Sequence, residues 1–467
     1  MMHRGSPSRV TGQEGRPPAR HPSARTTLTT ALLGAALLLP AAAHAEDDVT
    51  LVLHQEPFEV AFHDLDGDGG ASAGDLYTWV APVTTADGRT GTIVGDHQVV
   101  VLPTEGPFRE VRIGTSVIDL GDGDAIALGG IVPVTTPLGE IEPGITLANA
   151  IIGGTGLFGG AKGEIDSVRA EDGSWTHTLS FRTAGTVDPA RTLLMTMTAT
   201  DWSIAETSGD GKTGAGDFRV FHSIGSTDDG RTVESRGAHV VVSGPREDGG
   251  PVDVVGYSLA VVDGDLEVSI RAQTVTATGG IAGPVNSVIV GGTGRLAGAR
   301  GAWTGERRDD GTIVSRSVYF ADPVGEAERT LVLRSALPEV VTLDRGEPGP
   351  SIGDQRSWVL PFTSDAGEPA GTGYGYVTSL SPADDGTSVW MVAGLISVQL
   401  ADGSTILVAD LHPEETALPT AADLAVTRAV IGGTGAWAGA SGELVTTVDG
   451  NGGLVHTFAL RMPGAGM

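Results

Sequence analysis

The sequence contains no cysteine among its 467 residues. Without a thiol, the protein cannot form disulfides, use a thiolate nucleophile or bind a metal through sulfur. Basic residues are also few, with 29 Lys and Arg against 58 Asp and Glu, and the formal net charge is −29. Because such an acidic surface repels nucleic acid and anionic lipid, we expect no nucleic-acid partner. It suits solubility outside the cell or the attraction of cations.

The sequence also lacks any long stretch with a 3.6-residue apolar period. Glycine is abundant, at 70 residues, and Val, Thr and Ile fill short runs between turn signals such as Asp87-Gly88 and Asp229-Gly230. This pattern predicts an all-β protein.

Residues 1–45 have the pattern of a secretory signal. Several arginines precede an apolar run from Ala31 to Ala43, and Ala43-His44-Ala45 forms a small-residue cleavage site. The run is shorter than the ~20 residues that a spanning helix needs, so we expect no membrane span in the mature chain. The leader predicts secretion to the outside of the cell.

One glycine-rich stretch occurs three times, and the chain is organised around it. The copies follow the pattern GGTGxxxGAxG, are each preceded by Ile or Val, and begin at Gly153, Gly291 and Gly432. Such regular repetition indicates three copies of one structural unit. A phosphate-binding loop would need a helix after the glycines, and no helical period follows. The glycines are better explained by tight bends and close backbone approach in curved strands.

The three units should be tandem β-barrels. We assign residues 46–190, 191–328 and 329–467 to barrel repeats 1, 2 and 3. Each unit has about seven to nine strands joined mostly by short turns, and such a meander hides its edges most easily by closing into a barrel.

Each unit also carries a Gly-Asp pair followed four residues later by an aromatic residue. The three pairs end at Asp75, Asp217 and Asp354, and the aromatics are Trp79, Phe221 and Trp358. We expect each Asp to cap its loop by accepting backbone N–H bonds. The aromatics, with Tyr77, are candidates for a ligand-binding lumen wall, and core packing is the alternative interpretation.

The stretch from Ala150 to Gly163 resembles the signature of the allene oxide cyclase-like barrel family, which is related to the plant dirigent proteins. The Gly-Asp pattern resembles it too, and 346–354 resembles the bacterial branch. The resemblance covers all three units. It implies three eight-stranded antiparallel barrels, each with an apolar lumen open at one end. Single-barrel members are typically trimers, so this chain is expected to be a monomer whose three barrels form a pseudo-threefold trimer.

The family resemblance also implies a function. Family lumens hold a hydrophobic small molecule and steer its cyclisation or coupling without a nucleophile, so an enzyme of this type would be isomerase-like or cyclase-like. The acidic residue of the plant cyclases has no counterpart here, whereas His97 and His239 take the place of a cyclase Cys. They are the candidate acid–base residues. The alternative is a non-catalytic extracellular binding or structural protein with filled barrels.

Two further patterns complete the candidate sites. Asp64, Asp66, Asp68 and Asp75 match positions 1, 3, 5 and 12 of a calcium loop, although no helices flank it. We expect no cofactor from the sequence as a whole. Calcium at this loop is the alternative, and Asp75 is also explained as a loop cap. His177 and His456 match each other in the last strand of their units, and we expect them at a rim or surface.

Overall fold

The computed structural model describes residues 48–104, 107–136, 141–184, 187, 192–205, 213–243, 251–275, 283–320, 327–345, 351–382, 390–413 and 425–462. The predicted leader, residues 1–45, lies outside these ranges. The predicted repeat boundary between residues 190 and 191 also lies outside these ranges, and the domain limits stay predictions.

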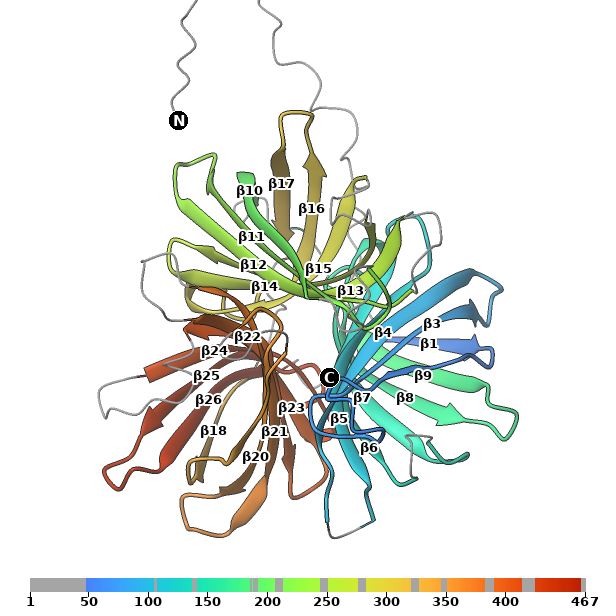
Figure 1. The fold of residues 1–467 in the computed structure, drawn as a ribbon, viewed down its shortest axis with the longest axis vertical. Coiled ribbons are helices and arrows are strands. Elements are labelled where there is room, and N and C mark those ends of the chain that lie inside the picture. Colours follow the sequence, from blue (N-terminus) through green and yellow to red (C-terminus); the bar gives the residue numbers. More distant parts are fainter. Residues whose placement is uncertain are drawn as a thin grey trace, which may run out of the picture. The chain divides into compact units, whose positions relative to one another are not determined.

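Barrel 1 is formed by the first third of the chain, drawn in blue to blue-green in Figure 1. Its strands are β1 (Asp48–Gln55), β2 (Ala61–His63), β3 (Leu76–Thr85), β4 (Thr90–Val101), β5 (Glu110–Asp119), β6 (Ala125–Val134), β7 (Thr146–Gly154), β8 (Lys162–Arg169) and β9 (Trp175–Arg182). Each strand from β3 to β9 pairs with the next, β9 pairs with β1, and β1 closes the ring on β3. The short β2 pairs with β3 outside this ring of eight.

Barrel 2 is a closed ring of eight strands in chain order. They are β10 (Leu193–Ala205), β11 (Phe218–Thr227), β12 (Thr232–Val241), β13 (Val252–Val262), β14 (Asp265–Val275), β15 (Val285–Gly292), β16 (Gly301–Arg307) and β17 (Thr312–Tyr319). Closure comes from the antiparallel pairing of β10 with β17.

Barrel 3 repeats the plan of barrel 1. Its strands are β18 (Ala327–Ser335), β19 (Val340–Leu343), β20 (Gln355–Thr363), β21 (Pro369–Pro382), β22 (Trp390–Leu400), β23 (Thr405–Pro413), β24 (Ala425–Thr434), β25 (Ser441–Val448) and β26 (Leu454–Met462). The ring closes where β18 meets β20, at the pair Arg334↔Thr363, and β19 pairs with β20 outside it.

The predicted fold class is confirmed, because the described chain is all-β and contains three closed eight-stranded antiparallel barrels. The helices in this part of the chain are short 3-10 turns that follow each GGTG stretch, namely η2 (Gly156–Phe158), η4 (Gly294–Leu296) and η6 (Gly435–Trp437). No helix among the described residues is both long and apolar enough to span a membrane.

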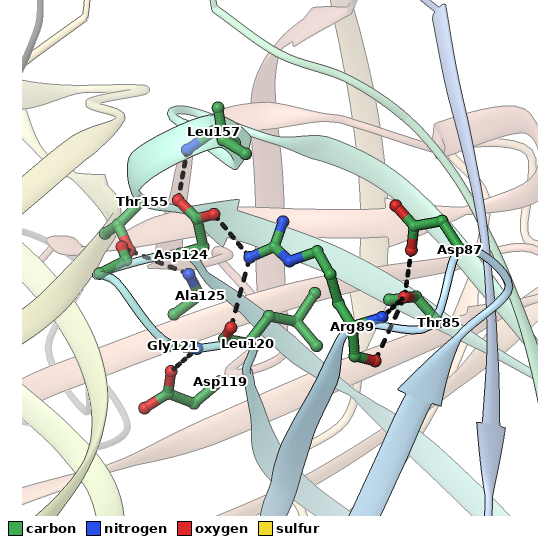
Figure 2. A network of polar contacts seen from close by, with 11 residues as sticks. Thr85, Asp87, Arg89, Asp119, Leu120, Gly121, Asp124, Ala125, Thr155 and Leu157 are labelled. Carbon is green, nitrogen blue, oxygen red and sulfur yellow. Dashed lines mark hydrogen bonds and ion pairs between the residues drawn. The ribbon is translucent and has the colours of Figure 1, made fainter.

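The threonine of the GGTG stretch fastens a neighbouring hairpin. In barrel 1 the Thr155 hydroxyl donates to the Gly123 carbonyl (2.7 Å) and accepts from the Ala125 N–H (3.2 Å), as Figure 2 shows for the latter. In barrel 2, Thr293 accepts the matching bond from the Leu266 N–H (3.1 Å). These contacts support the structural interpretation of the repeated stretch.

One end of barrel 1 is sealed by polar loop contacts above an apolar plug. Asp124 accepts bonds from the Leu157 N–H (2.8 Å) and from Arg89 Nη2 (2.7 Å), which joins three turns (Figure 2). A buried cluster that includes Leu53, Ile118, Ile126, Ile151, Phe158 and Phe181 lies at the same end. Because this end is filled, any lumen ligand must enter from the other end.

The first glycine of each GGTG stretch lies against a different barrel. A Cβ added to Gly153 would lie 2.5 Å from Val288 of barrel 2, one on Gly291 would lie 2.7 Å from Ile431 of barrel 3, and one on Gly432 would lie 2.6 Å from Ile152 of barrel 1. Each barrel therefore contacts the other two within one chain, and only glycine permits this approach.

Lys162 adds a polar tie at the same junction. Its side chain is buried, and its Nζ donates to the backbone carbonyls of Val290 in barrel 2 (2.8 Å) and Ile431 in barrel 3 (2.5 Å). One cluster of buried apolar residues drawn from all three barrels surrounds it. Other polar contacts also cross the junction, such as the bond from Gln355 Nε2 to Gln98 Oε1 (3.0 Å). That the chain is a monomer in solution stays a prediction.

Candidate functional site

Barrel 1 encloses a cavity of about 350 Å³ inside its ring of strands. Its walls carry aromatic and imidazole side chains, including Phe62, Tyr77, Trp79, His97, Trp175 and His177. The volume lies in the range of small-molecule sites, which begins near 300 Å³. The cavity is therefore large enough for an organic ligand.

A single glycine explains much of this space. Gly114, Gly256 and Gly394 are equivalent residues of β5, β13 and β22, and their partners on the next strand are Gly130, Arg271 and Asp410 respectively. Barrel 1 thus has no side chain where barrels 2 and 3 place a charged one into the lumen. Gly130 was not among the residues predicted from the sequence, although an alignment of the three units at this strand would have found it.

Asn149 lies over this glycine. A Cβ at position 130 would be 2.2 Å from the Asn149 Oδ1 atom, so the glycine makes room for the amide. That oxygen is buried, has no hydrogen-bond partner in the described protein, and belongs to a residue of the cavity wall. A buried acceptor without a partner is costly, and a ligand with a donor group would satisfy it.

The predicted lumen residues His97, Trp79 and Tyr77 all line the cavity. The His97 ring packs on Trp79 with centroids 4.5 Å apart. Burial, together with the nearby charge of Arg112, lowers the pKa of His97 to about 3, so its imidazole is neutral near pH 7. Burial raises the pKa of Tyr77 to about 12, so its phenol keeps its proton. Whether they bind or react with a ligand stays a prediction.

The positive charge in this wall is already neutralised. Arg112 forms an ion pair with Glu110 (Nη2–Oε2 2.6 Å), and both side chains are almost fully buried. The guanidinium carbon also lies 3.5 Å from the centre of the Tyr77 ring. Because this charge has a partner, the cavity favours a neutral ligand over an anion.

His177 is a second imidazole of the cavity. Its Nδ1 is 2.8 Å from Ser167 Oγ, its Nε2 is 2.7 Å from Gln55 Oε1, and Trp175 stacks parallel to it. Burial lowers its pKa to about 4. The expected rim or surface position was wrong, because His177 and His456 are each only 5% exposed and take part in lumen hydrogen bonds. Both histidines occupy inward-facing positions of their strands, and hydrogen bonds inside the lumen allow these polar side chains to be buried.

In barrel 2 the predicted residues His239 and Phe221 lie in a lumen with little space. His239 is fully buried, its ring is 5.2 Å from that of Phe221, and its Nε2 accepts a bond from Arg271 Nε (3.1 Å). The cavity beside these groups measures about 30 Å³, too little for an organic ligand.

In barrel 3 a polar network occupies the lumen. Arg428 Nε pairs with Asp410 Oδ2 (2.6 Å), and His412 Nδ1 is 2.7 Å from Asp410 Oδ1. Burial opposes ionisation of Asp410, but Arg428 and His412 outweigh it and lower its pKa to about 2. The predicted Trp358 packs against the apolar cluster of this barrel.

The three matched aromatics share one structural setting. Trp79, Phe221 and Trp358 each lie over a glycine of the next strand, namely Gly95, Gly237 and Gly375, where an added Cβ would come within 2.5 Å of the ring. This packing explains the repeated pattern in all three barrels. A ligand is therefore not needed to account for these residues, and their binding role stays a prediction.

The predicted calcium loop brings three carboxylates together. Asp64, Asp66 and Asp68 have oxygens within 4.8 Å of one another, whereas Asp75 accepts bonds from the N–H groups of Leu65 (2.8 Å) and Ser72 (2.6 Å). Asp75 thus acts as the expected loop cap. The other three could supply the oxygen ligands that calcium prefers, and binding stays a prediction.

Comparisons with known proteins add little to this geometry. No protein-family model matches the sequence, and no curated protein matches it. Among solved structures, pyocyanin demethylase is similar over 28% of this chain and 99% of its own length, at 24% identity and a TM-score of 0.24. A likeness at this level carries no functional argument. The function must therefore be argued from the lumens themselves.

Proposed function

We propose that this protein binds a neutral, hydrophobic small molecule in the lumen of barrel 1. The observation that carries the proposal is the cavity of about 350 Å³, which is walled by aromatic rings and opened by Gly130 where the other barrels carry charged side chains. The unpartnered Asn149 Oδ1 supports a ligand with one hydrogen-bond donor.

We further propose that the protein is related to the allene oxide cyclase-like and dirigent barrel proteins and steers a cyclisation or isomerisation of its ligand. His97 supports this reaction class. Its ring lines the cavity and has no hydrogen bond to any described residue, so a ring nitrogen is open to accept a hydrogen bond from a ligand. Because the pKa of His97 is about 3, the ring is neutral near pH 7 and would orient a ligand rather than act as a strong base. Secretion as a three-barrel monomer is part of the proposal and rests on the leader and the three repeats.

Binding can be tested with N-phenyl-1-naphthylamine, a neutral apolar fluorophore. We expect saturable binding to the whole protein with one site per chain, and quenching of Trp79 and Trp175 fluorescence. Ser116→Phe would place a ring in the cavity and should weaken binding at least tenfold. Val80→Phe adds the same ring on the outer face of the same barrel, where Val80 is 38% exposed, and should leave binding unchanged. Equal binding by the parent and Ser116→Phe would refute the lumen site.

The alternative function is a carrier without catalysis. The small chamber of barrel 2 and the charged pair inside barrel 3 are consistent with a protein in which only barrel 1 holds a ligand. Ligands that displace the fluorophore from barrel 1 can be incubated with the protein and recovered for mass spectrometry and NMR. An isomerised product that is lost in His97→Gln supports the enzyme. Ligands recovered unchanged support the carrier.

A further inference from the structure

The lumen of barrel 2 holds two guanidinium groups at close quarters. Arg219 on β11 is 1% exposed and Arg271 on β14 is 5% exposed. Burial lowers the pKa of each to about 9, and the charge of Arg271 adds to the effect on Arg219. Both groups are therefore still protonated near pH 7. The interior of this barrel carries positive charge, although the whole chain has a formal charge of −29.

The contacts of Arg271 are with uncharged groups. Its Nε donates to His239 Nε2 (3.1 Å), and its guanidinium lies 5.3 Å from the Phe221 ring centre and 5.5 Å from that of Trp303. His239 is neutral, because burial and the two arginines hold its pKa well below the usual value. Arg271 forms no ion pair with any carboxylate of the described residues. A buried charge without a counter-charge is strongly unfavourable.

The carboxylate of this lumen serves other partners. Glu267 accepts a bond from Ser317 Oγ (3.2 Å) and a short one from the Tyr319 hydroxyl. Burial raises its pKa, which opposes the charge that a counter-ion would need. The hydrogen-bond partners of Glu267 are these two hydroxyls, and it forms no ion pair with Arg271 among the described residues.

A small chamber lies beside Arg271. It measures about 30 Å³, and its polar lining consists of Arg271, the Glu267 carboxyl group and four serines, namely Ser223, Ser235, Ser258 and Ser269. Ser258 is 9% exposed, and its Oγ is buried with no hydrogen-bond partner in the described protein. A chamber of this size holds one small ion or about two waters, because one water needs roughly 10–15 Å³. Hydroxyl donors beside a guanidinium suit an anion.

We propose that barrel 2 binds one small monovalent anion of the halide class between the Arg271 guanidinium and the Ser258 hydroxyl. The anion neutralises the buried charge and accepts the unused hydroxyl bond. This site is in a different barrel from the proposed ligand cavity and does not depend on that function.

Bromide provides the direct test, because its anomalous scattering distinguishes it from water. Crystals of the whole protein grown in sodium bromide should show an anomalous peak in the barrel 2 lumen, within hydrogen-bond distance of Arg271 and Ser258. Density there without anomalous signal means that the chamber holds water, which overturns the proposal. Bromide found only on the outer surface overturns it equally.

Thermal melting tests the site in solution. At equal ionic strength, the parent should melt about 2 °C or more higher in sodium bromide than in sodium gluconate, because gluconate is too large for the chamber. Arg271→Gln should lose this difference. Arg295→Gln removes an exposed arginine of the same barrel and should keep it. An equal salt response in the parent and Arg271→Gln refutes the site. If Arg271→Gln does not fold, the presence or absence of the anomalous bromide peak in crystals of the parent protein decides whether the site exists.

Discussion

Asp96 places a buried carboxyl group at the junction between the barrels. It is 5% exposed, its Oδ1 accepts a bond from the Thr115 hydroxyl (3.1 Å), and the rings of Tyr257 and Tyr376 line the same small space. Burial raises its pKa from 3.8 to about 7. Replacement by the isosteric asparagine keeps the shape and the Thr115 bond and removes the titration.

The expected effect follows from linkage. Between pH 3.8 and about 7 the unfolded chain releases the Asp96 proton while the folded chain keeps it, so stability falls as the pH rises and is constant above about 7. At 1.36 kcal/mol for each pKa unit, the full loss is about 4 kcal/mol. Asp96→Asn should therefore stabilise the protein at pH 8, with an advantage about 2 kcal/mol larger than at pH 5.5.

Calorimetric melting at pH 5.5 and pH 8 measures this difference and avoids the sequence pI near 4.6, where solubility is lowest. Asp166→Asn is the matched control, because Asp166 is exposed on the outer face of β8. Its effect on the free energy of unfolding should be the same at pH 5.5 and at pH 8. A variant advantage that does not change with pH would show that Asp96 is ionised in the folded protein. Lower stability of Asp96→Asn at pH 8 would refute the reasoning outright.

Two further predictions concern the barrel junction and the acidic loop. Lys162→Met should lower the free energy of unfolding by about 1–3 kcal/mol, because it leaves two buried carbonyls without their donor; an unchanged melting temperature would contradict this. Calcium should raise the melting temperature of the parent but not of an Asp66→Ala, Asp68→Ala variant, because the carboxylates within 4.8 Å are its expected ligands. No rise in the parent would end the calcium prediction.

The sequence was sufficient for the architecture, because the relevant signals are local and repeated three times. Turn residues such as Asp87-Gly88 and the GGTG stretches mark strand ends, and short alternating runs between them predict strands. The period of two along a strand put Trp79 on the same face as Asp75, and the family resemblance put His97 in the lumen. These features depend on neighbours in the chain, so they can be read without the structure.

Which lumen is open was decided only by the tertiary structure. That depends on the summed volume of side chains from eight strands, most of them far apart in sequence. Gly130 leaves space in barrel 1 because the equivalent positions of barrels 2 and 3 carry Arg271 and Asp410. The lumen contact of His177 is with Gln55, which lies 122 residues earlier in the sequence. Closure of the rings also decides which lumen charges are paired. Arg428 meets Asp410 inside barrel 3, whereas Arg271 meets no carboxylate of the described residues inside barrel 2. The sequence alone therefore determined three barrels, and packing across each ring determined that the first one has room for a ligand.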